Sequence, residues 1–157
     1  MIKILFSLLC LVGFARADVV KPALVEISIF ENKILEVEVD FSLEAAMTGI
    51  GTQYKNTTDA PNSAYYDELR ALKPDVLRER FKAFETEFLN SLKLSVNNQI
   101  QALILTHAKI NIIGYKKRPR KTILTYQVQL SEWPETLSWQ YGKIYGDSAL
   151  RYQIYKK

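Results

Sequence analysis

The sequence predicts a mainly β fold of the α+β class. We expect an antiparallel β-sandwich of about seven or eight strands, with a two-helix insertion between strands 2 and 3. Two observations predict this fold. Short segments in both halves of the chain alternate apolar and polar residues and are separated by turn residues. The segment 44–91 carries helical spacing instead, and a proline stands where its longer helix would begin.

The first two strands are predicted over Val25–Ile29 and Leu35–Leu43. In the second, every other residue is apolar, and the residues between are charged or serine. That pattern is typical of an antiparallel strand with one face in water. Glu31–Lys33 separates the strands at hairpin length. Asn32 tolerates the left-handed conformation that such turns use, so we expect a hairpin.

The insertion is predicted to contain a short helical turn at Glu44–Met47, a polar loop and two helices. Pro61 suits the first turn of the first helix, whose apolar positions are Tyr65, Leu69 and Leu72. The second helix begins at Pro74 and carries one apolar stripe, made of Leu77, Phe81, Phe84 and Phe88. Such a stripe can line a ligand groove, but we favour packing on a sheet.

Alternation returns at Leu92 and continues to the end of the chain. Asn97–Asn98 is typical of a turn, and a basic loop at Lys116–Lys121 precedes a clearly alternating segment. The predicted strands in this half are 92–96, 100–105, 110–113, 124–130, 137–141 and 150–154.

The N-terminus predicts export. Lys3 precedes an apolar core at Ile4–Phe14, and Ala15 and Ala17 occupy the positions that a signal peptidase reads. The apolar core is shorter than the roughly 20 residues that span a bilayer. We therefore expect a signal peptide at 1–17, cleaved after Ala17, and one domain at 18–157 located in the periplasm or secreted.

Composition argues against several classes of function. The formal net charge is only +4, part of it in the leader, which does not indicate a nucleic-acid-binding protein. His107 is the sole histidine and Cys10, in the leader, the sole cysteine, whereas nickel and similar ions prefer imidazole and thiolate ligands. A serine triad would need His107 as its base, and no Gly-x-Ser-x-Gly turn occurs. We expect no enzyme, no cofactor and no metal centre, with a structural role for His107.

Part of the chain resembles a known family. The blocks that carry the resemblance are Phe41–Ile50, Thr58–Pro61 and Tyr66–Leu72, followed by a proline-started helix that reaches Arg80–Phe81. In order and spacing they are similar to the exported N-terminal domain of some HupE/UreJ-like membrane proteins. The membrane part of that family is accessory to hydrogenase or urease. The resemblance implies an accessory or docking domain, and carries no catalytic residue to this chain.

Two regions supply candidate ligand- or partner-binding residues. Tyr54 and Asp59 belong to the polar loop before Pro61, and Asp59 also suits a helix start or, with Asp67 and Glu68, a hard-cation site. In the basic loop the candidates are Lys116, Lys117, Arg118 and Arg120. That loop suits an anionic membrane surface or an acidic partner, although a solvated loop explains it as well.

The leading functional hypothesis from the sequence is a non-enzymatic exported module that docks on a HupE/UreJ-like membrane protein. The alternative is a periplasmic metal- or small-ligand-binding protein.

Overall fold

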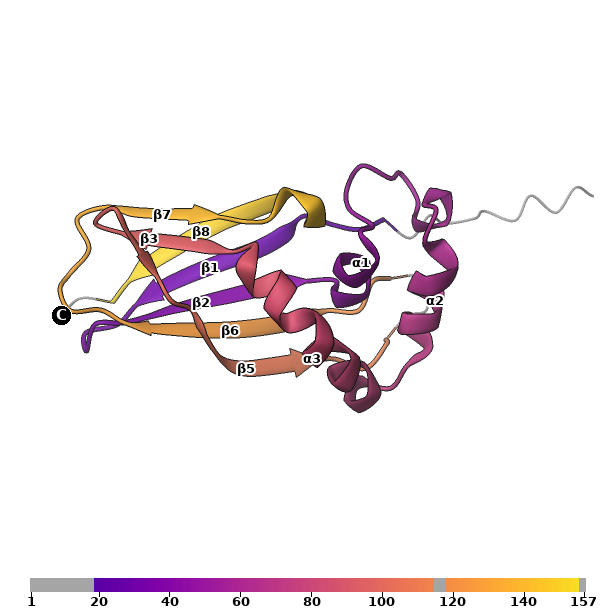
Figure 1. Cartoon of the computed structure of the whole chain (residues 1–157), viewed down its shortest axis with the longest axis horizontal. Coiled ribbons are helices and arrows are strands. Elements are labelled where there is room, and N and C mark those ends of the chain that lie inside the picture. The colour runs from indigo at the N-terminus through magenta and orange to yellow at the C-terminus, as the bar shows by residue number, and fades with distance from the viewer. Residues whose placement is uncertain (1–18, 115–117, 156–157) are drawn as a thin grey trace, which may run out of the picture.

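The computed structural model describes residues 19–114 and 118–155. The predicted signal peptide lies outside this part of the chain. Within it, no helix is both long and apolar enough to cross a bilayer. Eight strands form two sheets, and three α-helices lie between the second and third strands (Figure 1). The predicted α+β class and the place of the helical insertion are therefore confirmed.

The larger sheet has five strands in the order β5-β6-β2-β1-β8. Its neighbours pair antiparallel except β1 and β8, which run parallel, so the sheet is mixed rather than wholly antiparallel as predicted. A C-terminal strand can join β1 in either direction, and local alternation carries no information on that choice. The strands are β1 (Ala23–Ile29), β2 (Ile34–Phe41), β5 (Ile104–Ile110), β6 (Thr122–Gln129) and β8 (Ser148–Ile154).

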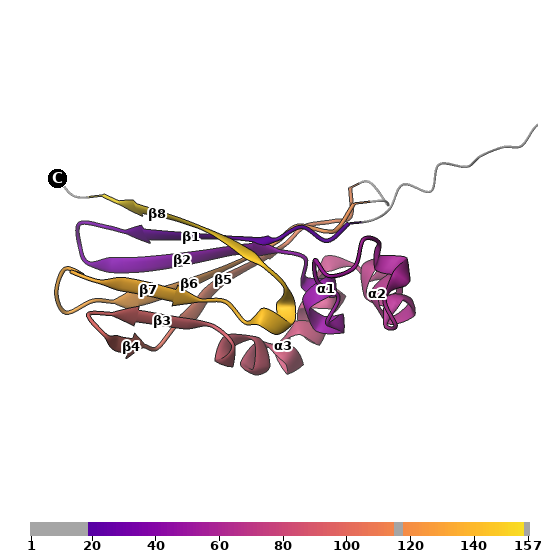
Figure 2. The ribbon, with the colours of Figure 1, turned by 90° about the horizontal axis from the view of Figure 1, so that it is seen from above.

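The smaller sheet is antiparallel, in the order β4-β3-β7, and forms a second layer with the longest helix (Figure 2). Its strands are β3 (Lys93–Val96), β4 (Gln99–Gln101) and β7 (Leu137–Gln140). Asn97 and Asn98 both have positive φ, as a two-residue hairpin requires, which confirms the predicted turn. Ile100–Leu105 is split between β4 and β5, and Ile110 ends a strand rather than starting one.

The helices are α1 (Leu43–Thr48), α2 (Ser63–Ala71) and α3 (Pro74–Asn90), with short 3₁₀ turns η1 (Thr57–Asp59) and η2 (Lys143–Tyr145). Gly49 ends α1 with φ of 67°, a conformation that glycine adopts without strain. α1 and α2 lie at one end of the sandwich, whereas α3 lies beside the smaller sheet (Figures 1 and 2).

The core lies between the two layers and follows the predicted alternation. Leu35, Val37, Val39 and Phe41 of β2 are buried, as are Leu77, Phe81 and Phe88 of α3. The aromatic stripe of α3 thus packs inward, and Phe88 stacks on Phe41 with ring centroids 4.8 Å apart. This contact joins α3 to the larger sheet.

Three local predictions need correction. In the first hairpin the left-handed residue is Lys33, and the Asn32 side chain instead accepts a hydrogen bond from the Ile34 N–H. Pro61 precedes the Asn62 N-cap, so it lies outside α2. Tyr66 is buried and Tyr65 is 41% exposed, because α2 turns the later tyrosine toward the core.

Candidate functional site

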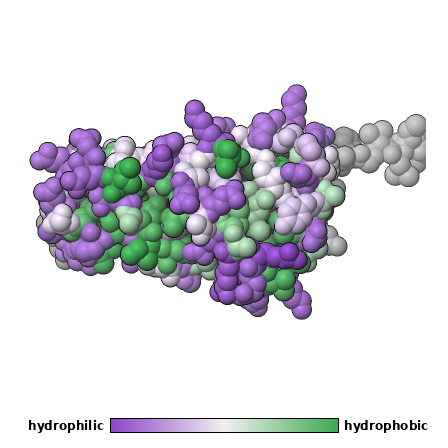
Figure 3. All heavy atoms as spheres, in the orientation of Figure 1, coloured by the Kyte–Doolittle hydropathy of each residue, from purple (hydrophilic) through white to green (hydrophobic). Residues whose placement is uncertain are grey.

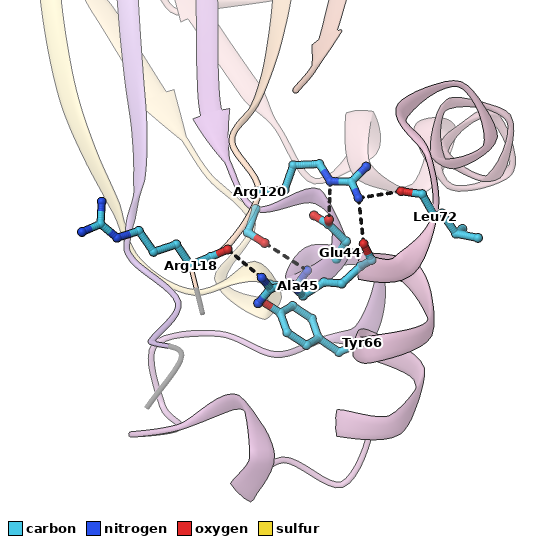
Figure 4. Close-up of polar contacts among 8 residues, drawn as sticks. Glu44, Ala45, Tyr66, Leu72, Arg118 and Arg120 are labelled. Carbon is cyan, nitrogen blue, oxygen red and sulfur yellow. Dashed lines mark hydrogen bonds and ion pairs between the residues drawn. The ribbon is translucent and has the colours of Figure 1, made fainter. Parts of the chain in front are cut away.

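The most unusual polar structure in the described residues is a buried network at the helical end of the sandwich. We define the end network as Glu44, Tyr66, Arg70 and Arg120 (Figure 4). Glu44 lies in the first turn of α1, Tyr66 and Arg70 lie on α2, and Arg120 lies just before β6. All four residues are buried, although charged side chains are seldom fully buried unless they are paired.

Glu44 and Arg120 form its centre. Arg120 Nε lies 2.9 Å from Glu44 Oε1, and both side chains have no solvent exposure. The N–H direction does not satisfy hydrogen-bond geometry, so this contact is an ion pair rather than an aligned hydrogen bond. A buried pair of this kind costs desolvation energy that its attraction only partly offsets. The stability of this ion pair therefore also depends on the hydrogen bonds that the other nitrogens of the Arg120 guanidinium make.

Arg120 fastens the loop before β6 to the end of α2. Its Nη2 donates to the carbonyl oxygens of Arg70 at 2.9 Å and Leu72 at 2.7 Å. The Arg70 carbonyl lies in the last turn of α2 and the Leu72 carbonyl at its C-cap, where the helix supplies no donor, and a cation there also favours the helix dipole. Arg120 is thus a C-terminal cap supplied from a distant segment.

Arg70 makes the reciprocal connection. Its Nη2 donates to the Arg118 carbonyl at 2.7 Å, and its guanidinium lies 5.5 Å from the centre of the Tyr66 ring. The two arginines therefore bind α2 to residues 118–120 in both directions. Such an arrangement holds two segments in a fixed relation, and it leaves the charged atoms away from solvent.

The electrostatics of the network follow from burial. Burial raises the pKa of Glu44, against the opposing effects of its own backbone N–H and of Arg120. Burial, and then the nearby Glu44 charge, raises the pKa of Tyr66. Burial, and then Arg120, lowers the pKa of Arg70. Glu44 is accordingly the member whose ionisation is displaced toward neutral pH.

This shift predicts a pH-dependent contribution to stability. The pKa of the Glu44 carboxyl is higher in the folded protein than in the unfolded chain. At any pH between these two pKa values, the folded protein therefore binds more protons than the unfolded chain does. Stability attributable to Glu44 should therefore rise as the pH falls from neutral toward the ordinary carboxyl pKa of 4.5. We expect the urea midpoint of the wild type, relative to Glu44→Gln, to increase over that range. A relative midpoint that stays constant or decreases would contradict the raised pKa.

The basic loop contributes less surface charge than its sequence indicates. Arg120 is buried in the end network, and Lys121 lies 2.9 Å from Asp40, an ion pair that raises the pKa of the lysine. Arg118 has an exposed side chain that points away from the network (Figure 4). Lys116 and Lys117 lie outside the described residues. The expected anionic-surface contact therefore depends on Arg118 and these two lysines.

The other predicted candidates lie apart from the end network's ion pair. Asp59 is exposed at the end of η1, and its N–H donates to the Asn56 carbonyl. Tyr54 is half-buried and packs on a small second cluster that includes Ile50 and Ala60. Thr52 donates to Asp147 at 2.9 Å, which ties the same loop to the chain beyond η2. The same cluster contains Tyr66 of the end network, so this loop packs on apolar residues at the helical end of the sandwich.

Metal and ligand sites have little support among the described residues. There, no group of three His, Cys, Asp or Glu side chains is placed to hold a metal ion. His107 is exposed on β5, next to a β-bulge. A groove of about 250 Å³ lies where Met47 and Tyr65 face α3, near Phe84. Small-molecule sites usually measure ~300–1,000 Å³, so this groove suits one side chain better than a ligand.

The sequence predicted a binding role for Arg120 in the basic loop, and predicted no site role for Glu44, Tyr66 or Arg70. One signal was present for Glu44, since it is the only charged residue in Leu43–Ile50. An acidic residue in the first turn of an apolar helix has a dipole-based explanation, however, so the pattern alone does not demand a buried partner. Comparisons of the chain with protein-family models, curated proteins and solved structures found no match.

Proposed function

We propose that this protein is a non-enzymatic exported module that docks on a membrane protein of the HupE/UreJ-like type. The observation that carries the proposal is a set of apolar residues along the edge of the sandwich where the chain crosses from β4 to β5. We define the crossing patch as Ile100, Leu103, Ile104 and Leu105. Ile100 is 74% exposed and Ile104 is 65% exposed. Figure 3 shows apolar atoms gathered over this part of the sandwich.

The residues of the crossing patch have properties that are typical of an interaction surface. Leu103 and Leu105 are partly buried and pack against the main core, so the backbone that presents the two isoleucines is anchored. Pairing with Ser95 places Ile100 on the outer face of the smaller sheet, and pairing with Gln127 places Ile104 on the outer face of the larger sheet. A partner would therefore contact both at the edge that lies between the sheets, and large exposed apolar side chains favour such a contact. Pre-positioned apolar groups also lose less conformational entropy when a partner covers them. These features support docking, and the resemblance of Phe41–Leu72 supports the type of partner.

Site-specific photo-crosslinking in the source organism tests this proposal. A benzophenone amino acid at Ile104 is expected to form an adduct with an integral membrane protein of the HupE/UreJ-like type. The same group at His107 is the matched control, because His107 is exposed on the same strand outside the crossing patch. Equal adducts from both positions, or adducts with soluble proteins alone, would contradict the proposal. When the benzophenone amino acid is placed at another residue of the crossing patch, the additional substitution Ile104→Lys should reduce its adduct with the membrane protein.

A further inference from the structure

The C-terminal strand β8 is an open sheet edge with an apolar row. In sheet order β8 follows β1, and no described strand pairs with its other side (Figure 2). Leu150, Tyr152 and Ile154 are 48%, 69% and 55% exposed. They stand in register with the buried Val25, Ile27 and Ile29 of β1, so they extend the core face of the sheet past its last covered strand.

The other edges of the two sheets are protected and β8 is not. β4 has three residues and β7 has four, which leaves little backbone for another strand to pair with. β5 is longer, but a bulge between Leu105 and His107 interrupts its register. β8 has seven residues in unbroken register with β1. Its single charged side chain, Arg151, lies 3.7 Å from Glu26 of its own sheet.

The direction of the backbone groups on β8 can be derived from its pairing. The Tyr155 N–H donates to the Ile29 carbonyl, and the Asp147 carbonyl accepts from the Ala23 N–H. In a parallel pair, alternate residues direct both groups to the neighbouring strand, so the odd-numbered residues of β8 face β1. The N–H and C=O groups of Ser148, Leu150, Tyr152 and Ile154 therefore point outward.

We propose that two copies of this chain associate by antiparallel pairing of β8 with β8, with Tyr152 on the two-fold axis. In this register Tyr152 faces its own copy, and Leu150 faces Ile154 of the second copy. These are hydrogen-bonded pairs, each of which exchanges two N–H···O=C bonds between outward-pointing groups. The apolar row becomes continuous across the interface. Two five-stranded sheets join into one, and the interface is isologous.

The charged and apolar side chains of β8 together favour this register, with a second copy of the strand as the occupant. With Tyr152 at the centre, Arg151 lies opposite Gln153 of the other chain, so a charged group meets an amide. Centring the pairing on Arg151 would place two guanidinium groups directly opposite each other, which destabilises a sheet. Centring it on Leu150 avoids that clash but places Tyr152 opposite Ser148 and Ile154 opposite Gly146, so the Tyr152-centred register is the one that gives the whole apolar row apolar partners. Docking through β8 is separate from docking through the crossing patch.

Sedimentation equilibrium of the purified protein tests the association. The wild type is expected to have twice the mass of one chain, and Tyr152→Lys should raise the dimer dissociation constant at least about tenfold, which is about 1.4 kcal/mol. Ile144→Lys is the control, because Ile144 is 63% exposed and lies in η2 rather than on β8. It should remain dimeric. A monomeric wild type, or a Tyr152→Lys variant that keeps its circular dichroism and remains dimeric, would overturn the proposal.

Cysteine crosslinking tests the register. In a Cys10→Ser background, which has no other cysteine, Tyr152→Cys should form a covalent dimer on mild oxidation. Facing Cα atoms in a hydrogen-bonded pair lie about 5.5 Å apart, within the reach of a disulfide. Arg151→Cys and Gln153→Cys should crosslink far less, because each is displaced from its own copy along the strand. Stronger crosslinking at position 151 than at 152 would overturn the assigned register.

Discussion

Replacing Arg120 with methionine is expected to lower the free energy of unfolding by about 3–5 kcal/mol. The substitution keeps an unbranched side chain but leaves the Glu44 carboxylate buried without its cation, which lies 2.9 Å away in the wild type. It also removes the donors to the Arg70 and Leu72 carbonyls at the end of α2. Urea unfolding monitored by tryptophan fluorescence measures the effect.

Arg118→Met provides the matched control for this prediction. It removes the same charge two residues away, but the Arg118 side chain is exposed, and the bond from Arg70 uses the backbone carbonyl. A cost within about 0.5 kcal/mol is expected. Equal costs for the two variants would show that the end network contributes nothing specific.

A double variant separates pairing from packing. Because a buried ion pair often contributes little relative to apolar residues of similar volume, Glu44→Leu combined with Arg120→Met should recover part of the stability lost by Arg120→Met alone. The helix-end carbonyls remain without Arg120 in both variants, so recovery should be incomplete. A double variant that is less stable than Arg120→Met would indicate that Glu44 has stabilising contacts besides the ion pair.

Strands and helices could be predicted from the sequence where the local spacing of apolar residues results from one buried face. Leu35–Leu43 predicted β2 because strict alternation occurs only when one side is covered, and Pro74 marked the start of α3 because it lacks an N–H. Tyr65 and Tyr66 could not be distinguished this way, since adjacent aromatic residues fit helical spacing in two phases. The parallel pairing of β8 is also non-local, and alternation at Leu150–Ile154 indicated a strand without indicating that its apolar side would be exposed.

The end network was hidden from sequence for a different reason. Glu44 and Arg120 lie in separate segments, and each charge by itself is typical of a surface residue. Only the folded topology, which brings the first turn of α1 beside the residues before β6, makes them partners. Arg120 was selected only as a member of the basic loop, with a surface role in binding. Its observed burial shows that a run of basic residues can combine exposed and internal side chains.

Replacing Phe88 with alanine should also destabilise the protein by about 3–5 kcal/mol, through a cavity at the junction of three elements. Phe88 is fully buried, stacks on Phe41 of β2 and lies 5.1 Å from the Tyr145 ring of η2. No single neighbouring element can close such a cavity, because α3, β2 and η2 are each fixed by separate contacts. Phe84→Ala, one turn earlier on the same helix, should cost clearly less because that ring is only partly buried. Thermal and urea unfolding of both variants measure the difference. Equal losses would mean that α3 is held by its exposed side as much as by its core stripe, contrary to the packing of Phe88 between the two layers.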